Sequence, residues 1–174
     1  NKNISNHLVK SKLINNLTTD RNNITIKSNK TYAFRTCASN KCCTCAYHAC
    51  NKTNFKSSVN KNTYTLRQDL YCNTDNIIYL ITCRKCDIQY VGETGRTLRD
   101  RINDHRSAIK TRKLTPIAIH FNSPEHSVLD LNALAIEKII DNPLANYSRK
   151  QREEFWQNKL NTKFPSGLNC MPIE

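Results

Sequence analysis

The fold is decided by the stretch from residue 77 to residue 92, which reads Ile-Ile-Tyr-Leu-Ile-Thr-Cys-Arg-Lys-Cys-Asp-Ile-Gln-Tyr-Val-Gly. Positions 77–82 are apolar and β-branched, a composition typical of a buried strand. Residues 88–92 form a second run of this kind after a short polar segment. We therefore predict two neighbouring strands joined by a turn that contains Cys83 and Cys86.

Further elements are predicted on the C-terminal side of this hairpin. Thr97 is a preferred N-cap residue, so a helix is expected from there through about Lys113. Residues 129–140 are largely apolar and predict a third strand. Ser148, followed three residues later by Gln151, predicts a capping box at the start of a last helix.

The last predicted helix contains an apolar stripe of Phe155, Trp156 and Leu160, which we expect to face the core. Together the elements predict an α+β fold over about residues 72–174, in which a small three-stranded antiparallel sheet is flanked by helices.

The positive charge is concentrated in the N-terminal part of the chain. Residues 1–70 contain 12 basic and 2 acidic residues, within a total of 27 Lys and Arg against 14 Asp and Glu. Such an excess favours polyanionic partners, because neutralising phosphates releases counterions. We expect a basic linker or the tail of a preceding domain at 1–36, a cysteine-rich zinc-binding linker at 37–72 and a folded domain at 73–174.

The nine cysteines predict metal ligands rather than disulfides. Their number is odd, they lie in tight clusters near histidines, and no secretory signal peptide is visible. Reduced thiolates imply a reducing compartment such as the nucleus or the cytosol. We also expect no membrane association, since no apolar run approaches the roughly 20 residues that a bilayer span requires. The chain is expected to be a piece of a longer polypeptide.

One zinc site is predicted around the turn of the hairpin. Cys83 and Cys86 have the Cys-x₂-Cys spacing, and His120 and His126 follow downstream. Two such cysteines with a later pair of histidines are a tetrahedral zinc pattern.

A second zinc site is predicted from the upstream cysteines. Cys42 and Cys45 again have the Cys-x₂-Cys spacing, Cys37 precedes them, and Cys72 lies just before the first strand. These four form our predicted ligand set. Three other residues of the cluster are alternative ligands that could replace a member of this set: Cys43, His48 and Cys50.

Tyr79 and, eleven residues later, Tyr90-Val91-Gly92 resemble the paired motif that names the GIY-YIG nucleases. Arg101 and His105 continue the resemblance, and one helical turn separates them, so they share a face of the predicted helix. The first motif departs from the family because no glycine precedes Tyr79.

The C-terminal part continues this resemblance. Residues 152–160 resemble the metal-binding helix of intron-encoded homing nucleases, which aligns Glu153 with the metal-binding glutamate and leaves Glu154 as the alternative. Gly167-Leu168-Asn169 resembles the family's terminal Gly-aromatic-Asn run, with Leu168 in place of the aromatic residue.

The resemblance implies a role for each of these residues. Glu153 would bind Mg²⁺ or Mn²⁺, and Arg101 would stabilise the pentacovalent phosphate. Tyr79 and His105 would share the proton transfer from water, Tyr90 would assist, and Asn169 would help to order the site. The implied products carry a 3′-hydroxyl and a 5′-phosphate.

A narrower resemblance is to the C-terminal endonuclease of Penelope-like retroelements. There, two cysteines lie between the tyrosine motifs and two histidines follow, as Cys83, Cys86, His120 and His126 do here. This implies a nuclear enzyme that nicks chromosomal DNA, so that the free 3′-hydroxyl primes reverse transcription of element RNA by the same polypeptide. The basic N-terminal stretch would then grip DNA or template RNA.

Three other interpretations remain open. The main alternative is a zinc-dependent nucleic-acid-binding module with an inactive nuclease core, which would bind DNA in a salt-sensitive manner without cleaving it. The others are a repair nuclease of the excision type and a cysteine-rich interaction protein.

Overall fold

The computed structural model describes residues 30–39, 42, 44–45 and 51–172. The chain divides into two compact units, Asn1–Lys30 and Thr31–Glu174, and the fold below is that of the second. The predicted basic linker therefore lies almost wholly outside the described residues, as do the three substitute ligands Cys43, His48 and Cys50.

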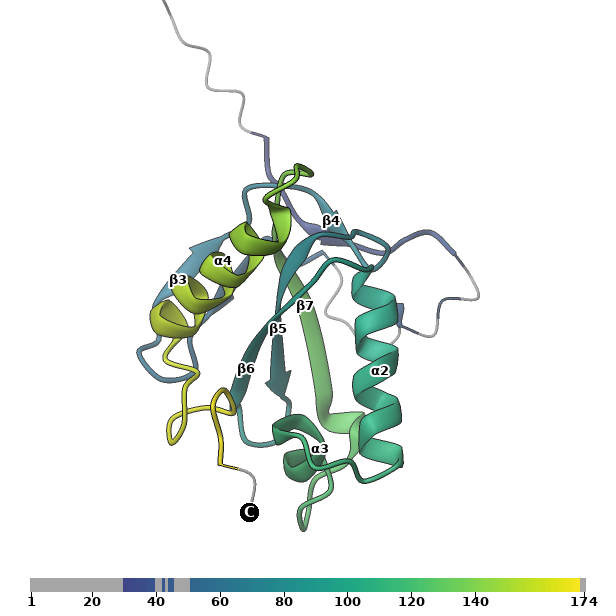
Figure 1. Ribbon diagram of the computed structural model, residues 1–174, viewed down its shortest axis with the longest axis vertical. Helices are drawn as coiled ribbons and strands as arrows, with labels where there is room; N and C mark the ends of the chain where they lie inside the picture. The colour runs from purple at the N-terminus through teal and green to yellow at the C-terminus, as the bar shows by residue number, and fades with distance from the viewer. Residues whose placement is uncertain (1–29, 40–41, 43, 46–50, 173–174) are drawn as a thin grey trace, which may run out of the picture. The chain divides into compact units, whose positions relative to one another are not determined.

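The central sheet has three antiparallel strands in the order β6-β5-β7 (Figure 1). They are β5 (Ile77–Cys83), β6 (Gln89–Thr94) and β7 (Leu131–Lys138). Within the central strand, Tyr79 is paired with Gly92 on one side and with Ala135 on the other. The predicted α+β class with a three-stranded antiparallel sheet is confirmed.

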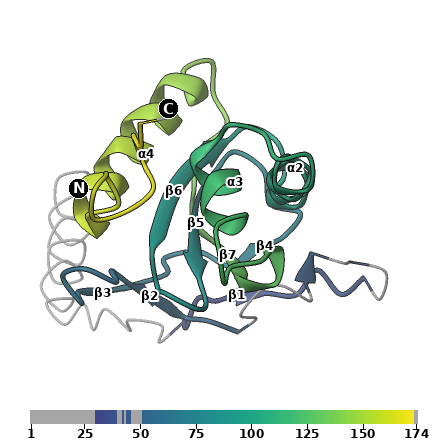
Figure 2. The same cartoon turned by 90° about the horizontal axis from the view of Figure 1, so that it is seen from below.

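Helices cover both faces of the sheet because side chains alternate along each strand. Tyr79 faces α2 (Leu98–Lys110), where it contacts His105, and the short helix α3 (Pro116–Phe121) packs against α2. Glu93 and Glu137 point the other way and bind α4 (Ala145–Leu160). Figure 2 shows α2 and α4 on either side of the sheet, with α4 beside the edge strand β6.

Four short strands precede the sheet and pack onto it. β1 (Phe34–Arg35) pairs in parallel with β4 (Leu70–Tyr71), and β2 (Asn54–Lys56) forms an antiparallel hairpin with β3 (Thr63–Thr65). Their buried side chains Phe34, Phe55 and Leu70 join the core of the sheet. Residues 31–174 cluster as one compact unit. The division into 1–36, 37–72 and 73–174 stays a prediction.

The predicted helix after the hairpin begins as expected, with the Thr97 hydroxyl accepting the amide of Asp100 at 3.2 Å. It ends at Lys110 rather than near Lys113, because Arg112 adopts a left-handed backbone conformation (φ 51°). The third strand is also shorter than predicted, because Val128–Asp130 form a 3₁₀ turn (η2) before it.

The predicted start of the last helix is wrong. α4 begins at Ala145, and no side chain caps its first turn, so Ser148 and Gln151 lie inside the helix instead of forming a capping box. A turn in which Asn142 Oδ1 accepts the amide of Leu144 at 2.8 Å starts the helix earlier. The predicted inward stripe is wrong at Phe155, which is 38% exposed, although Leu160 is fully buried.

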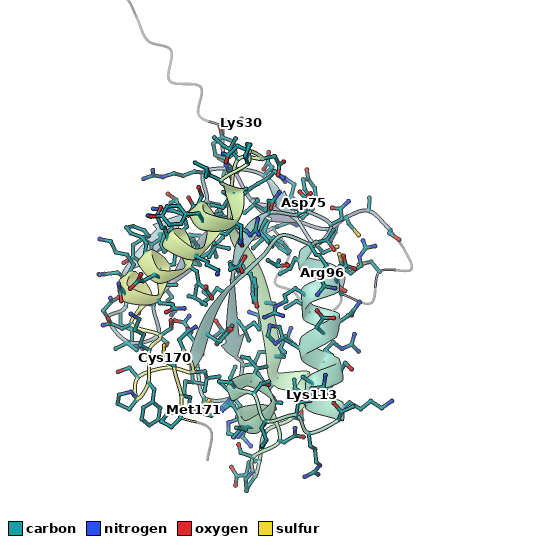
Figure 3. All side chains as sticks on the ribbon, in the orientation of Figure 1. Lys30, Asp75, Arg96, Lys113, Cys170 and Met171 are labelled. Carbon is teal, nitrogen blue, oxygen red and sulfur yellow. The ribbon has the colours of Figure 1, made fainter. Side chains whose placement is uncertain are left out.

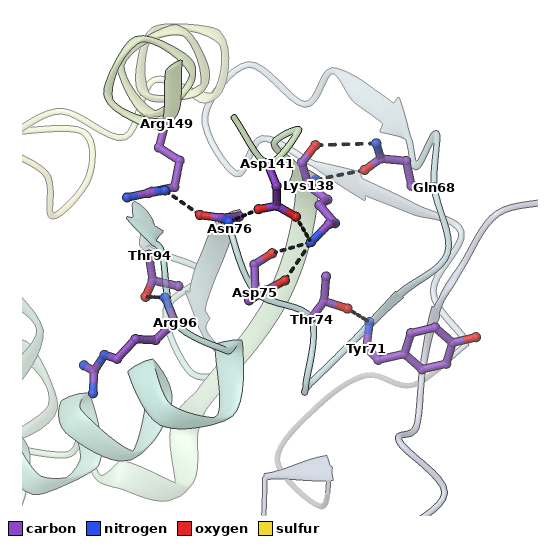
Figure 4. A network of polar contacts seen from close by, with 10 residues as sticks. All are labelled: Gln68, Tyr71, Thr74, Asp75, Asn76, Thr94, Arg96, Lys138, Asp141 and Arg149. Carbon is purple, nitrogen blue, oxygen red and sulfur yellow. Dashed lines mark hydrogen bonds and ion pairs between the residues drawn. The ribbon is translucent and has the colours of Figure 1, made fainter. Parts of the chain in front are cut away.

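A polar network ties the start of α4 to the central sheet (Figure 4). Arg149 of α4 donates to Asn76, and Asn76 in turn donates to Asp141. Lys138 at the end of β7 binds Asp75 at 2.6 Å and lies 3.5 Å from Asp141. The helix is thereby held at one end of the sheet.

None of the helices within the described residues has the length and apolarity needed to cross a bilayer.

Candidate functional site

The buried hydroxyl of Tyr79 is the centre of a polar cluster between β5 and α2. It lies 2.8 Å from His105 Nε2 and accepts a hydrogen bond of 3.0 Å from Arg101 Nε. The Tyr79 side chain is fully buried, whereas Arg101 is partly accessible. Arg101 and His105 are one turn apart on α2, and both reach the same tyrosine oxygen.

The protonation states of this cluster follow from its burial. Burial raises the pKa of Tyr79 far above its ordinary value, so the hydroxyl keeps its proton. Burial, together with the nearby positive charge of Arg101, lowers the pKa of His105 to about 4, so its ring is neutral at pH 7. Since Arg101 Nε can only donate, we assign the Tyr79 proton to the hydrogen bond with His105 Nε2.

Tyr90 on β6 lies on the same face of the sheet as Tyr79. Its ring centroid is 6.4 Å from that of Tyr79 and 6.0 Å from the His105 ring. Burial and then the negative charge of Glu153 raise its pKa. The position of the Tyr79 ring over β6 depends on Gly92, because a Cβ at that position would lie 2.3 Å from the Tyr79 hydroxyl oxygen.

Glu153 enters the same region from α4. It is half-buried and interacts electrostatically with Arg101, Tyr79 and Tyr90. Burial and the neighbouring Glu93 carboxylate raise its pKa. The alternative Glu154 is exposed and lies 3.8 Å from Lys163. Of the two neighbouring glutamates, Glu153 is therefore the one that faces the cluster.

Glu153 suits a divalent cation. Mg²⁺ keeps several waters and is held by one or two carboxylates together with substrate phosphates. The raised pKa of Glu153 reflects a carboxylate that is partly desolvated and lies beside a second negative charge, that of Glu93. A cation would relieve that repulsion.

Asn169 orders the edge of the sheet next to the tyrosines. Its side chain accepts the amide of Val91 at 2.9 Å and donates to the Val91 carbonyl at 2.7 Å. A tight turn at Gly167 places it there, since a Cβ on Gly167 would lie 2.3 Å from the Thr162 carbonyl oxygen. Asn169 thus positions Tyr90 and Gly92, which flank Val91.

The structure brings together Cys83, Cys86, His120 and His126, whose ligand atoms all lie within 4.8 Å of one another. Cys86 Sγ is 3.7 Å from His120 Nε2. His126 Nδ1 bonds the Pro124 carbonyl at 3.0 Å, while its buried Nε2 has no hydrogen-bond partner. A histidine held through one nitrogen with the other left open is the usual state of a metal ligand, so this quartet fits zinc.

The structure also brings together Cys37, Cys42, Cys45 and Cys72. Their sulfurs lie 3.5 Å (Cys42 to Cys72), 3.6 Å (Cys37 to Cys45) and 3.5 Å (Cys45 to Cys72) apart. Tetrahedral zinc–thiolate bonds of about 2.3 Å require sulfur separations of about 3.8 Å, so this quartet also fits zinc.

Arg99 links the second quartet to α2, and sequence reasoning missed it. Its Nη2 donates to Cys37 Sγ at 3.2 Å and to Cys72 Sγ at 3.5 Å. Arg99 lies two residues before Arg101 on α2. The sequence signal that could have identified Arg99 is its place as a basic residue in the first turn of a helix that follows a cysteine cluster.

Helix α3 was also missed, although it carries His120. The Thr115 hydroxyl accepts the Ala118 amide at 3.3 Å, and Pro116 stands at the first helical position. This Thr-Pro pair is a recognisable helix start.

Comparison with known proteins agrees with this geometry. A family model described as the GIY-YIG catalytic domain matches residues 75–169, more than half of the 174 residues. The chain therefore belongs to the GIY-YIG family, whose members are nucleases. No curated protein and no solved structure matches the chain.

Proposed function

We propose that the chain is a divalent-metal-dependent DNA endonuclease that cuts one strand at a time and leaves a 3′-hydroxyl. The supporting observation is the Tyr79 hydroxyl held between Arg101 and a neutral His105, with Glu153 facing the cluster from α4. These residues combine a proton acceptor, a phosphate clamp and a carboxylate for a cation.

The proton transfer follows from the assigned protonation states. An attacking water gives a proton to the Tyr79 oxygen while Tyr79 gives its own proton to His105 Nε2. The oxygen of the water then forms a bond to phosphorus as the bond to the 3′ oxygen breaks. No tyrosinate accumulates, which is consistent with the raised pKa of Tyr79. The leaving oxygen takes up a proton from solvent water and becomes the 3′-hydroxyl, and His105 releases the proton that it received to solvent.

Arg101 contributes its positive charge. Its Nε donates to Tyr79, which holds the guanidinium beside the hydroxyl, where its charge would stabilise the phosphate oxygens that become more negative in the transition state. Glu153 would hold the divalent ion, which when bound supplies Lewis-acid stabilisation of the leaving oxygen.

Nicking of supercoiled plasmid with Mg²⁺ or Mn²⁺ tests this function. Glu153→Ala and Arg101→Ala are each expected to reduce the rate by at least about a hundredfold. Glu154→Ala is the matched control, because that exposed neighbour faces away from the cluster. Zinc content is measured for every variant, so that misfolding is recognised.

Two outcomes of this experiment would contradict the proposal. Equal activity of Glu153→Ala and Glu154→Ala would contradict the assigned metal ligand. A zinc-loaded wild type that binds DNA in a salt-sensitive manner but never nicks it would favour the binding module with an inactive core.

We further propose that the nick primes reverse transcription of a retroelement RNA in the nucleus, with DNA and element RNA as partners. The support is the Penelope-like Cys83-Cys86-His120-His126 pattern together with its assembly into one cluster. The products test the polarity of the cut. DNA ligase should reseal the nicks and a DNA polymerase should extend them, since both need a 3′-hydroxyl, whereas failure of both would contradict a priming role.

A further inference from the structure

A groove of about 530 Å³ runs beside α4, between that helix, β3 and the end of β7. Four residues of α4 line it: Arg152, Phe155, Trp156 and Lys159. Their spacing places them on one face of the helix. Glu153 is not among them and instead interacts electrostatically with Glu93 and Arg101.

The groove presents aromatic rings. Phe155 is 38% exposed, and Trp156 and Tyr64 are half-buried. Trp156 packs edge-on against Tyr64 with ring centroids 5.4 Å apart and against Phe155 at 5.2 Å. Buried Phe55 packs beneath these aromatic rings and stacks on Tyr64, with ring centroids 5.7 Å apart. The Arg152 guanidinium lies over the Phe155 ring, 4.1 Å from its centroid, so one face of the ring is covered by that cation and a base would stack on the remaining exposed surface.

The groove is also positively charged. Arg67, Arg152 and Lys159 line it, and Glu137 is the acidic residue among its lining. Arg152 binds both oxygens of Glu137 at 3.0 Å, and Trp156 Nε1 donates to the same carboxylate at 2.6 Å. Glu137 is thereby neutralised, and the charges of Arg67 and Lys159 give the groove its sign.

We propose that this groove binds a single-stranded nucleic acid segment, with a base stacked on Phe155 and phosphates contacted by Arg67 and Lys159. An aromatic platform within a basic groove recognises unpaired bases, because a base in a duplex has no free face. An acidic peptide would use the charges but not the ring. The proposal does not rest on cleavage, because binding is measurable without it.

The position relative to the cluster suits this use. Arg152 and Glu153 are adjacent on α4, and one faces the groove while the other faces Arg101. Consecutive residues of α4 therefore contribute to the groove and to the cluster, so a strand in the groove is bound by the same helix that carries Glu153.

The test is fluorescence anisotropy with the full 174-residue, zinc-loaded chain, without Mg²⁺ or Mn²⁺. The probes are oligo(dT), oligo(U) and a DNA duplex of the same length. Phe155→Ala is expected to weaken binding of the single strands by about tenfold and to spare the duplex. Lys159→Ala is expected to reduce the salt-dependence slope by roughly 0.7. Phe155→Tyr should keep wild-type affinity.

Tyr147→Ala is the control, since Tyr147 is 62% exposed on the same helix and does not line the groove. Zinc content and melting temperature are measured for Phe155→Ala, Phe155→Tyr and Tyr147→Ala, because Phe155 also packs against Trp156 and a loss of folding must be distinguished from a loss of binding. If Phe155→Ala loses affinity only for oligo(dT), the groove is assigned to a DNA strand. If it loses affinity only for oligo(U), the groove is assigned to RNA.

Three results would overturn the proposal. They are equal effects of Phe155→Ala and Tyr147→Ala, an equal loss for duplex and single strand, and displacement of oligo(dT) by polyglutamate as effective as by unlabelled oligo(dT). As an independent readout, photo-crosslinking of a 5-iodouracil oligonucleotide should label the groove aromatics. Plasmid nicking by Phe155→Ala reports separately on the proposed cleavage.

Discussion

Gly92 is the residue on which the position of the Tyr79 hydroxyl depends. It is paired with Tyr79 across the β5–β6 ladder, and the tyrosine ring lies over its Cα. The glycine is needed for space rather than for an unusual backbone conformation, because its φ is not positive. The glycine of the second motif therefore has a direct steric function. Ile77, where the family's first motif has glycine, is simply buried in the strand.

Gly92→Ala is expected to displace the Tyr79 ring and to remove nicking activity. The added Cβ would lie 2.3 Å from the hydroxyl oxygen and 2.4 Å from the ring carbon that carries it. Overpacking of this kind costs about 1–3 kcal/mol of stability. Gly95→Ala is the milder comparison, because its Cβ would lie 3.1 Å from the Arg149 guanidinium and would not overlap the Tyr79 ring. Thermal unfolding and plasmid nicking measure both effects, and a fully active Gly92→Ala protein would contradict the steric argument.

His105 is expected to make stability fall in mild acid. Its pKa is about 4 in the folded protein and 6.5 ordinarily, so the unfolded chain binds the proton first. The contribution is fully present above pH 6.5 and is lost as the pH falls toward 4. The two values correspond to a loss on the order of 3 kcal/mol.

Urea unfolding at pH 7 and at pH 4.5 measures this loss. His105→Gln should lose less stability than the wild type over the same interval, and acid release of zinc affects both proteins alike. An identical loss in both would show that His105 does not titrate as its burial implies.

At the scale of elements, the edge strand β6 depends on a single side chain from the C-terminal loop. Asn169→Ala would leave the buried amide and carbonyl of Val91 without their partners. We expect a loss of about 1–3 kcal/mol in the free energy of unfolding, measured by urea titration. Exposed Asn158 on α4 provides the control, and Asn158→Ala should be close to neutral. Similar stabilities of the two variants would remove Asn169 from this role.

Local patterns predicted the central elements well. The apolar runs at 77–82 and 88–92 and the cap at Thr97 are signals that neighbouring residues determine, and β5, β6 and the start of α2 follow them. The spacing of Arg101 and His105 predicted a shared helix face, and both contact the Tyr79 hydroxyl.

Non-local contacts were not predictable in the same way. The exposed position of Phe155 follows from Trp156, which takes the inner place against Phe55 and Tyr64, two residues of a distant hairpin. The early start of α4 depends on the turn at Asn142 and on Arg149, which binds Glu93 across the sheet edge at 2.6 Å. No periodicity within residues 145–160 contains that information.

At the scale of the whole folded unit, the two candidate zinc clusters lie at opposite ends of β5. Cys83 ends that strand, and its cluster joins the hairpin turn to α3 and the loop after it. Cys72 precedes the strand, and its cluster reaches α2 through Arg99. The strand that carries Tyr79 and the helix that carries Arg101 are therefore each adjacent to a candidate zinc cluster, in addition to their packing in the hydrophobic core.

Zinc content should report these clusters separately. We expect two zinc ions in the wild-type chain and one in each of Cys72→Ser and Cys83→Ser, because each variant removes one of four ligands from one cluster. Cys170→Ser is the control, since Cys170 is an exposed free thiol in the loop after α4 (Figure 3) and should leave both ions in place. Atomic absorption measures the metal, and circular dichroism measures unfolding.

The two cluster variants should differ in their effect on catalysis. Cys72→Ser removes a ligand next to Arg99, so it should disturb the first turn of α2 and reduce nicking even at temperatures where the protein remains folded. Cys83→Ser should mainly lower the melting temperature, because its cluster joins the hairpin turn to α3, away from the Tyr79 hydroxyl. Equal nicking rates in folded, singly zinc-loaded Cys72→Ser and Cys83→Ser would mean that Arg99 does not transmit the state of its cluster to Arg101.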